Sequence, residues 1–344
     1  MRLLRWKSVI WTLALSSMAL GCGKGESGSA GVAKSQELLN VSYDPTRELW
    51  RELNGAFVPK YAKEAGVELT IKQSHGGSAS QSRAIIDGLD ADVATLAMWF
   101  DTDAIRRKGL INQGWEEKFP NRSLPYISTI VFVVRKGNPK GIKDWPDIVK
   151  PGVAIITPNP KTGGNGKLSF LAAWGSVIAA GGNDDAAKEF VTKLYQNVPV
   201  LDSAARAATT TFAQKGIGDV HLTWENEAHL EVAESGGELE IVYPSRSIQA
   251  EPHVAVVDAN VDRKGTRGAA EAYLNFLYTD EAQNIIAKHH YRPIKPEVLA
   301  AHQQAFPTIE LFPITKIAAN WDEAHTRFFA DGAVFDGIYQ PKSK

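Results

Sequence analysis

The sequence predicts an α/β protein of two lobes, each built around a doubly wound parallel sheet. Short apolar, β-rich runs alternate with amphipathic helical runs along most of the chain, which is typical of parallel sheets covered by helices. The 344 residues exceed the usual size of one domain. Two strong β-runs, residues 128–135 and 252–258, enclose a second set of α/β units, and we expect the chain to cross between the lobes there.

An export signal is predicted for residues 1–21. This segment has a basic start and an apolar stretch over residues 9–20 that is too short to span a membrane. Its removal takes away three basic residues and no acid, so the formal net charge falls from −1 to −4. Such a charge gives no reason to expect nucleic acid or an anionic membrane surface as a partner. We therefore expect the protein to work in the periplasm or elsewhere outside the cytoplasmic membrane.

Cys22, the only cysteine, comes next and opens a Gly/Ser-rich tether that we assign to residues 22–36. A single cysteine cannot form an intrachain disulfide. The residues before it resemble a bacterial lipoprotein processing site, although Ala19 stands where that pattern usually has Leu. We expect a lipid on Cys22 and membrane contact only through that anchor. The alternative is plain secretion, with Cys22 near the cleavage point.

The first lobe is assigned to residues 37–127. Asp44 followed by Pro45 indicates a helix start, since Asp caps helices and Pro fits the first helical turn. A second unit with the same plan follows. The expected elements are strands at 38–43, 67–73 and 93–98 and helices at 47–64 and 79–88.

The second lobe, with the first crossing strand, is assigned to residues 128–249. Residues 250–344 are expected to hold the second crossing strand, the return to the first lobe and a tail with several prolines. The expected elements are strands at 153–157, 220–223 and 239–243 and helices at 168–180, 186–194, 267–278 and 280–289.

Four short segments place small or capping residues just before a predicted helix, at 42–45, 75–78, 161–166 and 203–206. Helix N-termini carry unpaired N–H groups and a partial positive charge, so several that converge make a pocket for a small anion. Ligands of doubly wound sheets bind at the carboxyl ends of the strands, where these turns are expected. Each segment alone has a plainer explanation as a helix cap or a tight turn.

Trp224 follows the expected strand at 220–223. An indole in such a place usually belongs to the core, beside a capped helix. Its N–H group, however, can donate a hydrogen bond and cannot accept one, which suits a fully ionised oxyanion.

Other chemistries lack their motifs. Residues 161–169 resemble a phosphate loop, but Lys161 stands where Gly is needed and Leu168 replaces the Ser or Thr that would hold magnesium. The sequence has no His-Glu-x-x-His motif and no Cys cluster, so we expect no metal and no cofactor. The turn at 75–77 resembles a lipase oxyanion loop, but no Gly-x-Ser-x-Gly elbow follows it.

Seven stretches carry a resemblance to a known family. They are NVSYDPTRELW (40–50), QSHGGS (73–78), STIVFVVRKGNPK (128–140), PGVAIITPNPK (151–161), LAAWG (171–175), GIGDVHLTWENEA (216–228) and YRP (291–293). In this order they are similar to the sulfate-binding proteins of bacterial ABC importers. The resemblance implies the type II periplasmic-binding-protein fold, with two lobes that are joined by two hinge strands and close on a dehydrated sulfate.

The resemblance also implies which residues bind sulfate or thiosulfate. These are the backbone N–H groups of Asp44, Ser78, Gly164, Asn165 and Ala205 and the indole N–H of Trp224. Asp44 would act through its N–H and as a cap, with its carboxylate turned away. Arg206 would bond turn carbonyls or neighbouring side chains instead of the ligand.

Gly163 departs from the family, which usually has a Ser hydroxyl donor at this position of the site. A hydrogen bond to a charged group contributes about 1.5–3 kcal/mol, so its loss would weaken binding roughly tenfold to a hundredfold. Thr162 or a water molecule could replace the donor. The departure could also make room for the larger sulfur atom of thiosulfate.

The resemblance implies a solute-binding protein that delivers its anion to an ABC permease and its cytoplasmic ATPase, with no catalysis, and we expect a monomer. Sulfate carries no proton, so a pocket of donors alone suits it, whereas hydrogen phosphate would leave its O–H group unpaired. One alternative is a binding protein for molybdate or phosphate. Another is a secreted hydrolase that uses Ser78 and His75.

Overall fold

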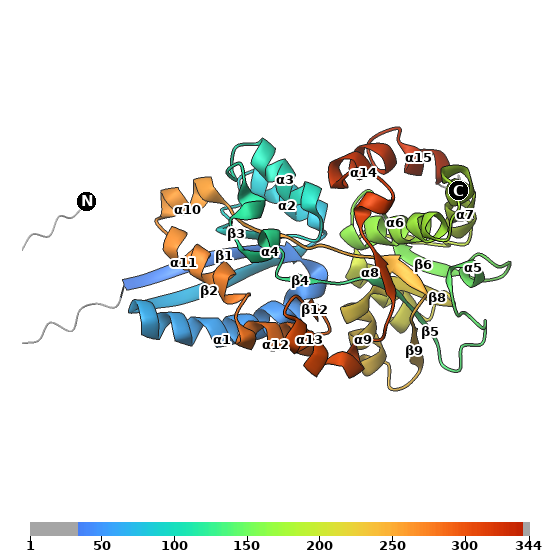
Figure 1. The fold of residues 1–344 in the computed structure, drawn as a ribbon, viewed down its shortest axis with the longest axis horizontal. Coiled ribbons are helices and arrows are strands. Elements are labelled where there is room, and N and C mark those ends of the chain that lie inside the picture. The colour runs from blue at the N-terminus through green and yellow to red at the C-terminus, as the bar shows by residue number, and fades with distance from the viewer. Residues whose placement is uncertain (1–33, 340–344) are drawn as a thin grey trace, which may run out of the picture. The chain divides into compact units, whose positions relative to one another are not determined.

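The computed structural model describes residues 34–339, which form two sheets covered by helices (Figure 1). The predicted export signal, Cys22 and most of the tether lie outside the described residues. Within residues 34–339, no helix has the length and apolar character that a membrane crossing needs. The mixed α/β architecture is the one that the sequence predicts.

The first sheet has the strand order β11-β3-β1-β2. Its strands are β1 (Lys34–Tyr43), β2 (Val67–Gly76), β3 (Val93–Thr95) and β11 (Val254–Val256). The first three are parallel, but β11 runs antiparallel to β3, so the prediction of a wholly parallel sheet is wrong here. The reason is that β11 enters the sheet after a return from the other lobe, which no local pattern records. Residues 34–36, which we assigned to the tether, are the start of β1.

Helices of the first lobe surround this sheet. They are α1 (Arg47–Ala65), α2 (Ser78–Ile86), α3 (Trp99–Arg107), α10 (Asp258–Lys264), α11 (Arg267–Phe276), α12 (Asp280–Lys288) and α13 (Pro296–Ala301). The short turn α4 (Pro120–Ser123) is left-handed at residues 121–123, where φ is 51–58°. A 3₁₀ turn, η1 (Asp44–Thr46), joins β1 to α1.

The second sheet has the strand order β7-β6-β8-β5-β9. Its strands are β5 (Ile130–Arg135), β6 (Ile155–Pro158), β7 (Leu201–Asp202), β8 (Val220–Trp224) and β9 (Leu239–Val242). Strands β6, β7 and β8 are parallel, whereas β5 is antiparallel to both of its neighbours, so this sheet too is mixed instead of parallel. The helices around it are α5 (Trp145–Ile148), α6 (Gly164–Ala179), α7 (Asp184–Gln196), α8 (Ala205–Thr209) and α9 (Glu225–Glu234).

Two connections join the sheets. The β-runs that we expected to cross between lobes each belong to one sheet, β5 to the second and β11 to the first. The crossing lies just before them, where Ser128 and Ala250 form an isolated antiparallel bridge. Beside it lie two small ribbons, β4 (Tyr126–Ile127) with β12 (Arg292–Pro293) and β10 (Arg246–Ile248) with β13 (Glu310–Phe312).

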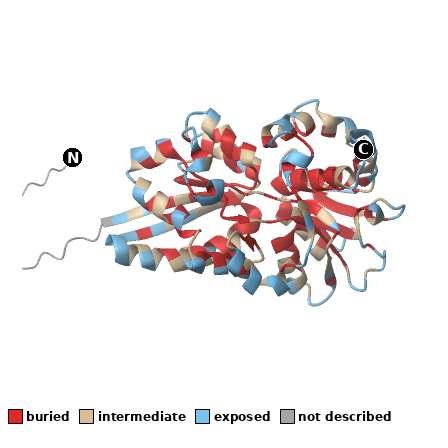
Figure 2. Cartoon of the chain, in the orientation of Figure 1, coloured by how far each residue is buried: buried red, intermediate tan, exposed pale blue. Residues whose placement is uncertain are grey.

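The C-terminal helices α14 (Trp321–Phe328) and α15 (Val334–Ile338) lie beside α6 and α7 of the second lobe (Figure 1). Phe328 and Phe335 of these helices share a buried cluster with Phe170 and Trp174 of α6. Buried residues fill β3, β8 and β11 and most of β5, whereas β2 has one buried residue, and Figure 2 shows buried residues concentrated toward the middle of the molecule. The second-lobe cluster also contains Tyr43, Ala97, Met98 and Phe100, so the two lobes share apolar contact.

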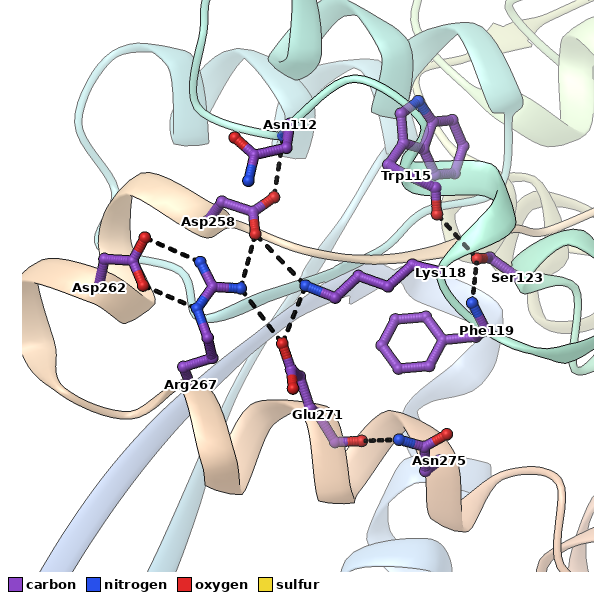
Figure 3. Close-up of polar contacts among 10 residues, drawn as sticks. All are labelled: Asn112, Trp115, Lys118, Phe119, Ser123, Asp258, Asp262, Arg267, Glu271 and Asn275. Atoms are coloured by element: carbon purple, nitrogen blue, oxygen red, sulfur yellow. Dashed lines mark hydrogen bonds and ion pairs between the residues drawn. The ribbon is translucent and has the colours of Figure 1, made fainter.

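A network of charged groups fixes the loop after α3 to α10 and α11 (Figure 3). The buried Asp258 carboxylate accepts hydrogen bonds from the Asn112 backbone N–H at 2.8 Å and from Arg267 at 2.8 Å. Arg267 also binds Asp262 through two parallel hydrogen bonds, and Lys118 reaches Glu271 at 2.9 Å. This network holds the outer side of the first lobe, far from the strand ends that face the second lobe.

Candidate functional site

A small cavity lies where the carboxyl ends of strands from both sheets meet. The centre of a water molecule could occupy a volume of about 10 Å³ in this cavity, which is close to the minimum that one water needs. Its lining residues are Tyr43, Asp44, Pro45, Gly76, Gly77, Ser78, Ala97, Gly163, Gly164, Asn165, Ala204, Ala205 and Trp224. All seven residues that the sequence nominated for the anion thus line one cavity, and Arg206 lies outside the lining.

The first lobe contributes Asp44 and Ser78. Asp44 is the first residue of η1, and its carboxylate accepts a hydrogen bond from Arg47 at 2.6 Å. The carboxylate does not cap a helix, so the predicted capping role is wrong. Ser78 is the first residue of α2, and its hydroxyl donates to the buried Asp101 carboxylate at 2.5 Å. Both side chains therefore have partners outside the cavity. Their backbone N–H groups remain the groups that can serve a ligand.

The second lobe contributes the start of α6. This helix begins at Gly164, four residues before the predicted start, so the glycine-rich segment is the first helical turn and not a loop. Gly163 precedes it in an extended conformation, with φ −122° and ψ 138°. A Cβ on Gly164 would lie 2.8 Å from the Ala97 Cβ, so only glycine lets the lobes approach this closely.

The polar side chains around the start of α6 point elsewhere. Thr162 donates its hydroxyl to the Ser203 carbonyl at 2.7 Å and so does not replace the donor missing at Gly163. Lys161 contacts Asp336 at 2.9 Å and two carbonyls of the C-terminal segment. Asn165 donates to the Leu222 carbonyl at 3.2 Å, while its Oδ1 is buried without a hydrogen-bond partner among residues 34–339.

Ala205 opens α8, and Arg206 beside it joins the two lobes. The Arg206 guanidinium lies 2.9 Å from Glu227 of its own lobe and 2.8 Å from Glu48 of α1. Glu227 is 2% exposed, and burial raises its pKa to about 8 even though Arg206 opposes the shift. Arg206 therefore contacts neighbouring carboxylates, one of the two kinds of partner that the sequence left open.

Trp224 ends β8 at the floor of the cavity and is fully buried. Its ring packs against Tyr43, with 5.3 Å between ring centroids. Within residues 34–339, none of the hydrogen bonds found involves the Trp224 indole N–H. The side chain is thus both a core residue and a wall of the cavity, and the two explanations offered by the sequence do not exclude each other.

A buried ion pair beside the cavity was not predicted from the sequence. Asp101 of α3 lies 4.0 Å from the Lys167 ammonium of α6, and both side chains are buried. Burial raises the pKa of Asp101 and lowers that of Lys167, because each charge has left water. The signal that could have found it is a lone lysine in the first turn of a helix that is otherwise apolar.

The hydrolase alternative needs a base beside Ser78, and the structure gives His75 other partners. Its Nε2 pairs with the Gln73 side chain at 2.7 Å and its Nδ1 with the Tyr43 carbonyl at 3.2 Å. Burial lowers the pKa of His75. Among residues 34–339, no three His, Cys, Asp or Glu side chains gather closely enough to hold a metal ion.

The electrostatics of the cavity favour an anion. The first residues of α2, α6 and α8 border it, as does Trp224, which precedes α9, and helix N-termini carry unpaired N–H groups and partial positive charge. The charged member of the lining, Asp44, is neutralised by Arg47. The arrangement brings donors from both lobes to one small cavity.

Comparison with known proteins agrees with this architecture. Residues 46–292 match the family of bacterial extracellular solute-binding proteins. The chain is 49% identical to a thiosulfate-binding protein of Pseudomonas aeruginosa, over 95% of this chain and 98% of that protein. It is 51% identical to a sulfate-binding protein of Escherichia coli, over 89% of this chain and 94% of that protein.

Among solved structures, the sulfate-binding protein SubI from Mycobacterium tuberculosis superposes with a TM-score of 0.78. It is 32% identical, and the match covers 85% of this chain and 99% of that one. The resemblance and the two-lobed fold expected from the sequence are thereby confirmed. The chain belongs to the bacterial extracellular solute-binding proteins.

Proposed function

We propose that this protein binds sulfate or thiosulfate in the cavity between its lobes and delivers the anion to an ABC importer. The relatives named for these anions share about half of their residues with this chain over nearly its full length. The observation that carries the proposal is the cavity itself, which gathers helix N-termini from both lobes around one small space.

The donors that we assign to the anion are those that the sequence nominated. They are the backbone N–H groups of Asp44, Ser78, Gly164, Asn165 and Ala205, with the indole N–H of Trp224. Their residues line the cavity from both sides, which supports a clamp in which each lobe supplies part of the ligand shell. Gly163 supplies no side-chain donor.

Selectivity follows from the excess of donors over acceptors: the Asp44 carboxylate is paired with Arg47, and the Asn165 Oδ1 is a buried acceptor without a partner among residues 34–339. A buried pocket of donors satisfies a fully ionised oxyanion, whereas hydrogen phosphate brings an O–H group that must find an acceptor or lose its hydrogen bond. An unpaired buried polar group can weaken binding of the wrong ligand by several orders of magnitude. We infer that sulfate and thiosulfate bind far more tightly than phosphate.

The protein would act outside the cytoplasmic membrane as a carrier and not as an enzyme. We propose that Cys22 is lipidated and that the protein is a monomer. We also propose that the connections near Ser128 and Ala250 are hinges between a lobe of residues 37–127 and 250–301 and a lobe of residues 128–249, on which the C-terminal helices α14 and α15 also pack. The partners of Ser78 and His75 support the absence of catalysis, because neither side chain contacts the other.

Calorimetric titration of the purified protein with sulfate, thiosulfate, phosphate and molybdate tests the proposal. We expect saturable binding of sulfate or thiosulfate with one site per chain, and much weaker binding of phosphate. Tight binding of phosphate or molybdate, with none of the sulfur oxyanions, would assign the cavity to another anion. Hydrolysis of ester or phosphoester substrates would contradict the carrier role.

A further inference from the structure

A second and larger cavity, of about 230 Å³, lies between the lobes and shares Pro45 with the lining of the anion site. Its walls come from α1 of the first lobe, α9 of the second lobe and residues 288–291 at the end of α12. The contacts around it cross between lobes. Arg292 binds the buried Glu225 carboxylate through hydrogen bonds of 2.7 and 2.8 Å, and Asn226 donates to the Pro45 carbonyl at 3.3 Å.

Two histidines that line this cavity stack face to face across the lobes. The rings of His229 and His290 have centroids 3.7 Å apart and planes inclined by 6°. His229 lies on α9, which packs against the second sheet, whereas His290 follows α12, which packs against α1. His290 has φ 58°, in the left-handed region that few residues other than glycine adopt. The backbone therefore adopts an uncommon conformation in placing this ring.

The groups around the pair leave both rings without a carboxylate partner of their own. His229 Nε2 pairs with the Tyr243 hydroxyl at 3.0 Å, and His290 Nδ1 is buried without a partner among residues 34–339. The charged or titratable groups that surround the pair are Glu225, Glu227, Tyr243 and Arg292 near His229, and Glu48, Glu52, Arg206, Lys288 and His289 near His290. Glu48 is paired with Arg206, Glu225 with Arg292, and Glu52 with Lys288 and His289.

We propose that the stacked pair His229 and His290 makes lobe closure sensitive to pH, so that the pair weakens anion binding as the pH falls below neutrality. Two stacked imidazoles can pack closely when neutral, but two imidazolium ions at this distance repel each other. Opening of the lobes separates the rings and returns them to water. The inference rests on the proposed function, because it assumes that the lobes close on an anion.

The direction of the effect follows from proton linkage. Burial, with His290 and Arg292 nearby, lowers the pKa of His229 to about 4, and burial with His289 nearby lowers that of His290. A histidine with a lower pKa in the closed form binds fewer protons there, so acid favours the open form. Closure is unaffected above the ordinary imidazole pKa of about 6.5 and is progressively lost between there and about pH 4. Sulfate stays a dianion over this range, so the ligand adds no titration.

The size of the effect can be stated for His229 alone. If its pKa changes from about 6.5 in the open form to about 4 in the closed form, the anion Kd rises about tenfold between pH 7.5 and pH 5.5. His75, His253 and His325 also have lowered pKa values and act in the same direction to the extent that opening exposes them, whereas Glu227, whose pKa burial raises to about 8, acts in the opposite direction. A test must therefore compare variants with the natural protein and not rely on the total response.

The experiment measures the Kd for sulfate and thiosulfate at about pH 7.5 and about pH 5.5 in the natural protein and in His229→Phe, which keeps a flat ring that cannot titrate. We expect the ratio of the two Kd values to be about tenfold smaller in His229→Phe. The matched control is His302→Gln, since His302 lies outside the cavity lining and contacts Asn284. That variant should keep the natural ratio. Equal ratios in His229→Phe and the natural protein would overturn the inference.

A second variant and a second measurement keep the inference testable if His229→Phe does not fold. His290→Asn fits the left-handed backbone and removes the other ring, so it should also reduce the ratio. Calorimetry at about pH 6 in two buffers of different ionisation enthalpy should show about 0.7 fewer protons released on anion binding by His229→Phe. Unchanged proton release would contradict the inference. Binding of neither anion at either pH would overturn the proposed function and this inference with it, whereas binding with unchanged ratios overturns the inference alone.

Discussion

The indole N–H of Trp224 is the side-chain donor among the proposed ligand contacts. Trp224→Phe keeps an aromatic ring against Tyr43 and removes the N–H, so sulfate binding should weaken by about 1.5–3 kcal/mol. Trp174→Phe is the control, because that buried indole donates to Asp184 outside the cavity. It should lower the thermal midpoint without changing the affinity. Unchanged sulfate affinity in Trp224→Phe would leave Trp224 with a packing role only.

Gly163 can be tested because its backbone accepts a side chain. Its φ of −122° is open to any residue, and a Cβ there would meet only ordinary contacts, the nearest being the Ser203 carbonyl at 3.5 Å. Gly163→Ser should therefore add a hydroxyl donor and tighten sulfate binding about tenfold to a hundredfold. Gly163→Ala supplies the same Cβ without the hydroxyl and should not tighten it. Equal affinity of the two variants would show that the hydroxyl caps α6 instead of facing the anion.

Sequence reasoning found the residues that line the cavity but not the roles of their side chains. The turns could be located because Gly, Ser and Asp before a helix leave a clear local pattern. The partner of the Asp44 carboxylate could not be predicted. Both a capped backbone N–H and the Arg47 side chain lie within one turn of Asp44, so the sequence does not distinguish them. The ion pair of Asp101 and Lys167 joins residues 66 positions apart in two different lobes, and no local pattern records such a distance.

At the scale of the elements, the first turn of α6 depends on close packing. A Cβ on Gly166 would lie 2.4 Å from the Pro158 carbonyl oxygen and 2.7 Å from the Asn159 carbonyl carbon, both backbone atoms. Gly166→Ala should therefore lower the free energy of unfolding by about 1–3 kcal/mol and weaken anion binding by shifting this turn. The control is Gly55→Ala in α1, where a Cβ meets nothing within 4 Å and Ala should stabilise the helix by about 0.5–1 kcal/mol. Similar stability of the two variants would contradict the packing argument.

Most strands and helices could be predicted because apolar residues recur with different periods in the two kinds of element. The observed bounds differ from the predicted ones by a few residues. Strand direction could not be predicted, as β5 and β11 show: an apolar run has the same pattern whichever way it enters a sheet. The start of α6 was placed too late because glycines are poor helix formers. Tertiary contact of Gly164 with Ala97 and of Gly166 with the chain before it outweighs that preference.

At the scale of the whole molecule, the lobes are joined near Ser128, near Ala250 and by the segment between α13 and β13, and by contacts that cross between them, such as Arg206 with Glu48. If they clamp the anion, sulfate should make the protein more compact in small-angle scattering and raise its thermal midpoint. At a free ligand concentration of about 100 times Kd, binding adds about 2.7 kcal/mol to the free energy of unfolding. Stabilisation without compaction would indicate a rigid pocket and contradict the clamp.

The position of the C-terminal helices shows what the sequence leaves open at this scale. We could assign a tail after the return to the first lobe, but α14 and α15 pack on the second lobe through Phe328 and Phe335. An amphipathic run predicts which face of a helix is buried. It does not predict which of several similar apolar surfaces that face packs against.

The most direct test of the central claim is a crystal structure of the protein grown with a saturating concentration of sulfate or thiosulfate. We predict one anion in the cavity, with its oxygen atoms within about 3 Å of the Trp224 Nε1 and of backbone nitrogens from both lobes, including those of Ser78 and Gly164. An anion bound elsewhere, or held by one lobe only, would contradict the claim that two lobes share the ligand through backbone donors.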